Sequence, residues 1–189
     1  MSTTEQVITS DQSPRSDVVK VWDIAVRAFH WSLVITYTLA WLTADAWDSI
    51  HEAAGYFIGG LLLFRILWGL VGSKHARFRN FIFKPSTVIT YLKESLHHKA
   101  KRYIGHNPAG GAMVIVLLLS LASVIGSGIA ITTDMFWGVK WMEDLHDASA
   151  TLTLILVGLH VAGVIFASFE NKENLVKAMI TGFKRRTSR

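Results

Sequence analysis

Two histidines in the last apolar segment of the chain, His146 and His160, are separated by 14 positions. Because an α-helix has 3.6 residues per turn, this spacing places both imidazoles on nearly the same face, ~21 Å apart along the axis. One would then lie near each surface of a hydrocarbon layer ~30 Å thick. Two further histidines, His30 and His51, lie in other apolar segments. Four histidines at two depths of a membrane predict two stacked haems, each with two histidine ligands, and hence electron transfer across the membrane.

The pairing of these histidines follows from the directions of their segments. His30 lies early in the first segment and His160 late in the antiparallel fourth, so we expect both at one depth. His51 and His146 begin the second and fourth segments and share the other depth. Two imidazoles on one iron give a b-type haem with no open position for oxygen. Small residues near these histidines suit either a flat macrocycle or ordinary helix packing: Gly55, Ala150 and Gly163.

Four apolar runs are long enough, or nearly so, to cross a membrane as helices: residues 26–44, 53–71, 113–131 and 148–167. A soluble chain of 189 residues, 51% apolar, rarely carries four such runs. The expected fold class is therefore an all-α membrane protein, an up-down bundle of four transmembrane helices that holds two b-type haems.

The pattern predicts one membrane domain over residues 21–186, which includes a loop at about 72–107. In this loop, Pro85 is expected to begin a short interfacial helix. Asn107-Pro108 is typical of a helix start and opens the third long helix. The polar residues 1–20 have no apolar core of signal-peptide length and are expected to form a mobile tail, as are residues 187–189.

The chain contains no cysteine. This excludes disulfides, iron–sulfur clusters, thiolate zinc sites and covalently attached c-type haem, which requires a C-x-x-C-H motif. Any haem in this chain must therefore be held by side chains other than thiolates.

The net charge of +5 is distributed unequally, in a way that favours a membrane over nucleic acid. The two expected outer connections contain one basic residue, Lys140, among several carboxylates. The other basic residues, apart from Arg65, flank the opposite ends of the spans: Arg15, Lys20, Arg27, Lys74, Arg77, Arg79, Lys84, Lys93, Lys99, Lys101, Arg102, Lys172, Lys177, Lys184, Arg185, Arg186 and Arg189. Because basic loops stay in the cytoplasm, both termini and the long loop are expected there.

Three further residues are candidates for contacts with cofactors at the cytoplasmic side. Arg27 and Arg65 could bind haem propionates or extend to the lipid headgroups. His106, in Gly105-His106-Asn107-Pro108, could hydrogen-bond a quinone carbonyl and exchange a proton at the membrane surface, because its ordinary pKa is near neutrality. The alternative for His106 is a structural turn at the helix entry.

Several of these residues fall in motifs that resemble the bacterial cytochrome b561 family, which includes the b-type cytochrome subunits of nickel–iron hydrogenases. In this chain, the motif Trp22-Asp23-x-x-x-Arg27-x-x-His30-Trp31 is similar to the first-helix signature of the family. The motifs His51-x-x-x-Gly55-Tyr56 and Arg65-x-x-Trp68-Gly69 resemble the second helix of the family. The Gly105–Pro108 turn, Asp144-x-His146 and His160 resemble the later helices. The resemblance covers residues of about 21–186.

The resemblance implies a di-haem cytochrome in the bacterial inner membrane, with haem iron held by His30, His51, His146 and His160. The expected function is electron transfer between the quinone pool and a periplasmic redox protein, such as a c-type cytochrome. Hydrogenase subunits of the family tend to be longer, so a general electron-transfer role is expected before a dedicated hydrogenase role. The sequence does not determine the direction of electron flow, nor whether the chain forms a homodimer.

Two alternatives remain at this stage. One is the superoxide:quinone oxidoreductase activity found in the same broad family, for which cationic side chains at the outer face would guide the superoxide anion. Only Lys140 is basic there. The other alternative is a histidine-lined metal transporter, which would need carboxylates or polar groups beside the histidines within the spans. The spans are largely apolar apart from the histidines and arginines, which counts against it.

Overall fold

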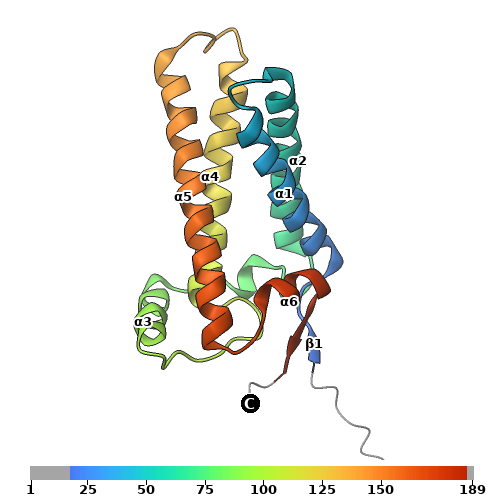
Figure 1. Cartoon of the computed structure of the whole chain (residues 1–189), viewed down its shortest axis with the longest axis vertical. Helices are drawn as coiled ribbons and strands as arrows, with labels where there is room; N and C mark the ends of the chain where they lie inside the picture. The colour runs from blue at the N-terminus through green and yellow to red at the C-terminus, as the bar shows by residue number, and fades with distance from the viewer. Residues whose placement is uncertain (1–17, 187–189) are drawn as a thin grey trace, which may run out of the picture.

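The computed structural model describes residues 18–186, and these form a mostly helical bundle. Four long helices lie side by side and alternate in direction (Figure 1): α1 (Ile24–Thr43), α2 (Asp48–Val71), α4 (Pro108–Ile131) and α5 (Lys140–Glu170). This confirms the predicted up-down helical arrangement. All four begin before the apolar runs that predicted them; α2 and α5 extend there into polar residues such as Asp48 and Lys140.

Three of the described helices, α2, α4 and α5, are long and apolar enough to cross a membrane. The prediction of four spans is supported for these three helices and is not confirmed for α1. Its 20 residues include Arg27, His30 and several threonines, which lower its mean hydropathy. Helix α1 nevertheless packs along α2.

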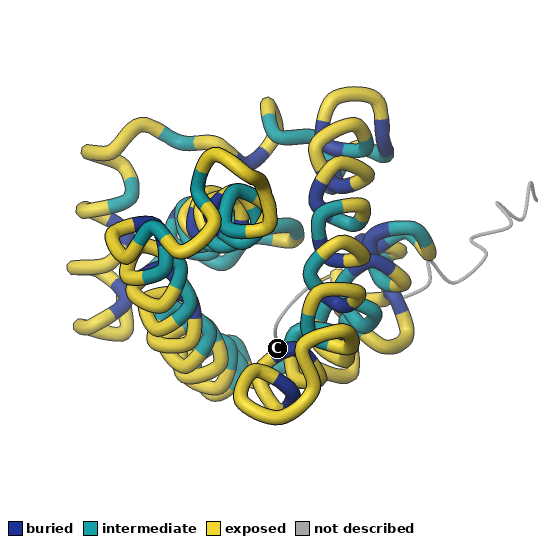
Figure 2. The backbone as a smooth tube through the Cα atoms, turned by 90° about the horizontal axis from the view of Figure 1, so that it is seen from above, coloured by how far each residue is buried: buried dark blue, intermediate teal, exposed yellow. Residues whose placement is uncertain are grey.

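Buried positions are few (Figure 2), many of them are polar, and many large apolar side chains are exposed. Leu63 and Leu67 of α2, for example, are 65% and 63% exposed. Such an apolar surface suits lipid, which supplies no hydrophobic force between helices. Hydroxyl pairs instead connect α4 to α5: Ser120 Oγ lies 2.6 Å from Thr153 Oγ1, and Ser123 Oγ lies 2.8 Å from Ser149 Oγ.

The entry into α4 follows the prediction. Asn107 caps the helix by accepting a hydrogen bond of 2.6 Å from the amide of Gly110, and Pro108 occupies the first turn. An asparagine cap followed by proline satisfies an exposed amide and fixes the backbone for a helix. The predicted interfacial helix is α3 (Pro85–Leu96), which begins at Pro85 as expected.

The two ends of the described chain are tied together, which the sequence did not predict. Strand β1 (Val18–Lys20) pairs antiparallel with β2 (Phe183–Arg185), after the short helix α6 (Leu175–Thr181). The expectation of a mobile tail is therefore wrong for residues 18–20, because their backbone groups bond to β2; residues 1–17 and 187–189 lie outside the described part. Gly182, at φ +88°, ends α6 in a left-handed conformation that favours glycine.

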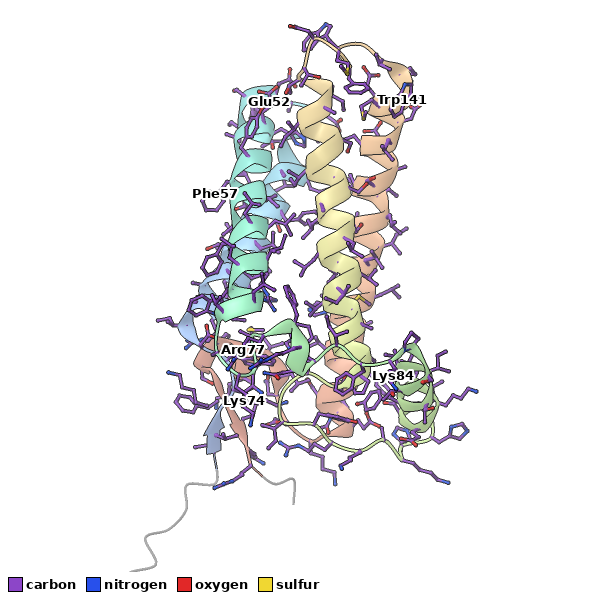
Figure 3. The ribbon with its side chains drawn as sticks, turned by 180° about the vertical axis from the view of Figure 1, so that it is seen from behind. Glu52, Phe57, Lys74, Arg77, Lys84 and Trp141 are labelled. Carbon is purple, nitrogen blue, oxygen red and sulfur yellow. The ribbon has the colours of Figure 1, made fainter. Side chains whose placement is uncertain are left out.

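The bundle has two chemically different ends (Figure 3). The acidic end is where α2 and α5 begin, with Glu52 and Trp141 beside the two connecting loops. The basic end holds α3, α6, the β1–β2 ribbon and the 3₁₀ turn η1 (Phe78–Asn80), with Lys74, Arg77 and Lys84 among its side chains. Helix α1 packs on α2, α2 on α4, and α4 on α5, whereas α1 and α5 do not pack extensively on each other.

Candidate functional site

His51 and His146 face each other at the acidic end. Their ring centroids are 6.1 Å apart and the ring planes differ by 82°. Two imidazoles on opposite sides of one metal, each with a metal–nitrogen bond of ~2.0–2.1 Å as on zinc, have centroids roughly 6 Å apart. The predicted pair is therefore brought together across the bundle, from α2 and α5, at a separation that suits a shared metal ion.

Backbone carbonyls fix the orientation of both rings. His51 Nδ1 lies 2.9 Å from the carbonyl oxygen of Ala40 in α1, and His146 Nδ1 lies 3.0 Å from that of Val124 in α4. A carbonyl oxygen only accepts, so Nδ1 carries the proton in each ring and donates it. Each Nε2 then keeps a free lone pair, which is the arrangement that metal-binding histidines adopt.

The His146 ring packs closely against the backbone of α4, and this contact surface is its seat. A Cβ atom on Gly128 would lie 3.0 Å from Cε1 and 3.3 Å from Nδ1 of this ring. The Ser127 hydroxyl lies 3.2 Å from the same Nδ1 and donates to the carbonyls of Ser123 and Val124. The sequence analysis missed Ser127 and Gly128; the cluster of small residues from Ser123 to Gly128 in an apolar segment is the signal that points to them.

A cavity of about 570 Å³ opens beside this histidine pair. It is lined by residues from all four long helices, among them Tyr37, Gly55 and Ala150. A Cβ atom on Gly55 would meet nothing within 4 Å, and the buried Tyr37 hydroxyl has no hydrogen-bond partner within the described residues. The volume is typical of a site for a cofactor or another small ligand.

The second predicted pair lies toward the basic end. His30 of α1 and His160 of α5 are close enough to interact electrostatically, and His30 Nδ1 is buried without a partner. His160 is 14 residues after His146 on one continuous helix, which separates the two levels by ~21 Å. The structure thus places the four histidines at two levels of the bundle.

Arg65 is buried on α2, with a relative exposure of 3%. It is 14 residues after His51, so it projects from the same face of α2 at the level of the second pair. Its Nη2 donates a 3.1 Å hydrogen bond to the carbonyl of Ala76, and its guanidinium lies over the rings of Phe78 and Phe81. Its Nη1 is buried without any partner. A buried cation with a free donor is costly unless an anion completes it.

His106 is enclosed instead of lying at a surface. Its ring centroid is 4.7 Å from that of Trp22 and 4.4 Å from that of Phe81. Burial first, and then the positive charges of Arg65 and Lys184, lower the pKa of His106 to about 3. These surroundings favour the neutral ring and do not support proton exchange near neutral pH at His106, whose contact with a quinone stays a prediction.

Arg27 and its neighbour Asp23 connect elements at the basic end. Arg27 Nη2 donates to the carbonyl of Ile180 in α6, while its Nε is buried without a partner. Asp23 caps α1 and also accepts hydrogen bonds from Trp68 and Ser73. Partial burial raises the pKa of Asp23, but these hydrogen bonds outweigh it and hold the pKa below its usual value, so this carboxylate stays ionised.

Comparison with known proteins identifies the family. The model of the prokaryotic cytochrome b561 family matches residues 21–182. Three proteins named probable Ni/Fe-hydrogenase B-type cytochrome subunit are among the relatives. Those from Bradyrhizobium diazoefficiens and Rhodobacter capsulatus are 24% identical, covering 87% and 90% of this chain and 85% and 82% of their own lengths. The one from Azotobacter vinelandii is 21% identical and covers 90% of both chains. No solved structure matches significantly.

The family match spans every histidine of the two pairs and the motifs around them. It agrees with the helical bundle, its long apolar helices and the facing imidazoles of His51 and His146. The chain therefore belongs to the prokaryotic cytochrome b561 family, and it is a membrane b-type cytochrome of electron transport.

Proposed function

We propose that this cytochrome carries two haems, one between His51 and His146 and one between His30 and His160, and that it transfers electrons across the membrane. The observation that carries the proposal is the facing pair His51/His146, with both Nδ1 atoms committed to carbonyls. When bound, a bis-histidine haem supplies one-electron transfer without an open coordination position. The position of His160, 14 residues after His146 on the same helix, supports the second site.

The residues present at both levels fit a haem. At the acidic end, the cavity of about 570 Å³, the open space at Gly55 and the unpartnered Tyr37 hydroxyl leave room and a polar contact for a macrocycle. At the basic end, the free Nη1 of Arg65 would donate to a propionate and receive the anion that its burial requires. Arg27 also has a buried nitrogen without a partner, but it is the weaker candidate because it lies in the first turn of α1, nearer the membrane surface than Arg65.

We further propose that α1 is the fourth membrane span. Its 20 residues extend ~30 Å at 1.5 Å per residue, which equals the hydrocarbon thickness. The basic end would then lie in the cytoplasm of a bacterial cell and the acidic end in the periplasm, because basic segments are retained inside. Both described chain ends and α3 would be cytoplasmic.

The proposed partners are a quinone at the basic end and a periplasmic redox protein at the acidic end. The names of the relatives make a hydrogenase one candidate for the redox protein, and a c-type cytochrome is another. A quinone needs proton exchange with the cytoplasm, which favours the basic end. Because burial lowers the pKa of His106 and favours the neutral ring, we assign it a hydrogen bond to the quinone and assign the proton exchange to another group.

The superoxide:quinone oxidoreductase alternative receives little support from the acidic end. Carboxylates line the cavity there, and they would repel a superoxide anion. The one basic residue near this end, Lys140, is bound to Asp144 at 2.7 Å and lies 3.8 Å from Glu143. We therefore favour transfer to or from a redox protein.

A haem count tests the proposal. The purified full-length protein should give two b-type haems per chain in a pyridine haemochrome assay. His160→Ala and His146→Ala should each lose one haem and keep the other, because each removes a ligand from a different level. As a matched control, exchange of the exposed His97, which follows the last residue of α3, for alanine should keep both. Fewer than two haems in the unaltered protein, or two in both ligand variants, would refute the proposed sites.

A further inference from the structure

The surroundings of the two histidine pairs differ in charge. Carboxylate side chains line the acidic-end cavity, and no lysine or arginine does so among the described residues. They are Asp45, Asp48, Glu52 and Asp147. Glu52 and Asp147 line the same cavity as His51 and His146, so negative charge is held in the surroundings of both ligands.

Positive charge is held near the other pair. The buried guanidinium of Arg65 lies at the level of His30 and His160 and has a free donor. It acts electrostatically on His106, which in turn interacts with His160. Asp23 is the acidic group that interacts with Arg65, but its carboxylate already accepts three hydrogen bonds. No ion pair joins Asp23 to Arg65 among the described residues, and Arg65 Nη1 stays without a partner, so the positive charge at this level is only partly compensated.

The ligands also differ in their hydrogen bonds. His51 and His146 donate from Nδ1 to backbone carbonyls, which makes an imidazole a more basic ligand. Among the described residues, His30 Nδ1 is buried without a partner. A more basic ligand and nearby negative charge both stabilise ferric over ferrous iron, whereas nearby positive charge does the opposite.

We propose that these residues hold the reduction potential of a haem at His51/His146 below that of a haem at His30/His160. This inference rests on the proposed function, because it requires a haem at each level. Electrons would then move favourably from the acidic end to the basic end, one at a time, from a reduced redox protein to a quinone. Two such transfers and two protons from the basic side convert one quinone to quinol, while the redox protein is oxidised by the same two electrons.

Potentiometric titration of the purified two-haem protein, followed by visible absorption, tests the order of the potentials. Two one-electron steps should be resolved, at least ~59 mV apart, which corresponds to a tenfold preference for the electron at the basic end. His146→Ala should remove the lower-potential step and His160→Ala the higher one. If His160→Ala removes the lower step, or if the two steps coincide, the inference is wrong although the two-haem function stands.

Charge variants test the cause, measured at low ionic strength where screening is weak. Glu52→Gln with Asp147→Asn should raise the lower potential, while the exposed Glu94→Gln in α3, a loss of charge at the other end, should move it much less. Arg65→Gln should lower the higher potential and Arg65→Lys should largely restore it. Unchanged potentials in both the Glu52→Gln/Asp147→Asn variant and the Arg65→Gln variant would overturn the electrostatic explanation. A haem count below two in the unaltered protein would instead refute the proposed function itself.

Discussion

The position of the His146 ring is set by the backbone of α4 and not by another functional side chain. The carbonyl of Val124 accepts its Nδ1 proton, and the missing side chain of Gly128 leaves room for its ring. A ligand held on one side by a carbonyl and on the other by close packing has little freedom to turn away from a metal. The precision of the acidic-end site therefore depends on the backbone of α4.

Gly128→Ala should weaken the acidic-end site selectively. The new Cβ would lie 3.0 Å from Cε1 of His146, so the ring must shift and strain its hydrogen bond to Val124. Overpacking of this kind costs ~1–3 kcal/mol, which corresponds to roughly a tenfold to hundredfold weaker retention of the haem. Haem content after dilution in detergent measures this loss. Gly126→Ala is the matched control, since its Cβ would meet nothing within 4 Å; equal retention in both variants would contradict the proposed seat.

The site could be predicted from sequence only where side chains carry the signal. The four histidines and Arg65 are conspicuous in apolar segments, and the 14-residue spacings in α5 and α2 relate them. The carbonyls of Ala40 and Val124 could not be identified, because every residue has a carbonyl. The enclosure of His106 by Trp22 and Phe81 also escaped prediction, because it depends on contacts between distant segments.

At the scale of elements, the loop around η1 packs against α4 and contacts Arg65 and His106 at the basic end. Phe81 is buried at 2% exposure and contacts both Arg65 and His106. Its backbone approaches α4 so closely that a Cβ on Gly111 would lie 2.2 Å from the Phe81 carbonyl oxygen. This approach holds the loop, and through it the Arg65 guanidinium, in place.

Gly111→Ala should disturb the basic-end level and spare the acidic end. A backbone oxygen cannot move aside as a flexible side chain can, so the loop must leave α4 and carry Phe81 with it. We expect a loss of at least ~1–3 kcal/mol of stability and a selective loss of the haem held by His30 and His160. Haem content and the two-step redox titration measure this. A profile like that of Gly126→Ala would show that the loop contact is dispensable.

The long helices could be predicted from their apolar runs, and Asn107-Pro108 located one helix start correctly. The β1–β2 ribbon and α6 could not, because three-residue strands and a seven-residue helix carry no periodic pattern of their own. Their stability comes from tertiary contacts such as those of Arg27 with Ile180 and Arg102 with Glu173. The hydroxyl pairs between α4 and α5 were also missed, since serine and threonine in a span suit many environments.

At the scale of the molecule, the charge difference between the ends acts on any partner that approaches. Apart from Lys140, which is bound to Asp144, the described charged residues of the acidic end are all carboxylates: Asp45, Asp48, Glu52, Asp134, Glu143, Asp144 and Asp147. These groups are largely exposed, so they contribute little to stability but create a long-range field over the acidic-end cavity. A basic redox protein would be attracted to the place where its electron is exchanged.

Electron exchange with a lysine-rich c-type cytochrome should therefore slow as salt is raised. Long-range attraction increases the rate of encounter more than the final affinity, and it is screened beyond ~10 Å at 0.1 M salt. Stopped-flow measurement of haem reduction by the reduced c-type cytochrome at low and high ionic strength gives this dependence. Neutralising Asp48 and Asp144 together should lower the rate at low salt and flatten the salt dependence, whereas Glu94→Gln at the basic end should change neither. A rate that ignores salt, or one that rises when Asp48 and Asp144 are neutralised, would show that the acidic end does not guide a basic partner, and that its carboxylates only reflect the orientation of the chain in the membrane.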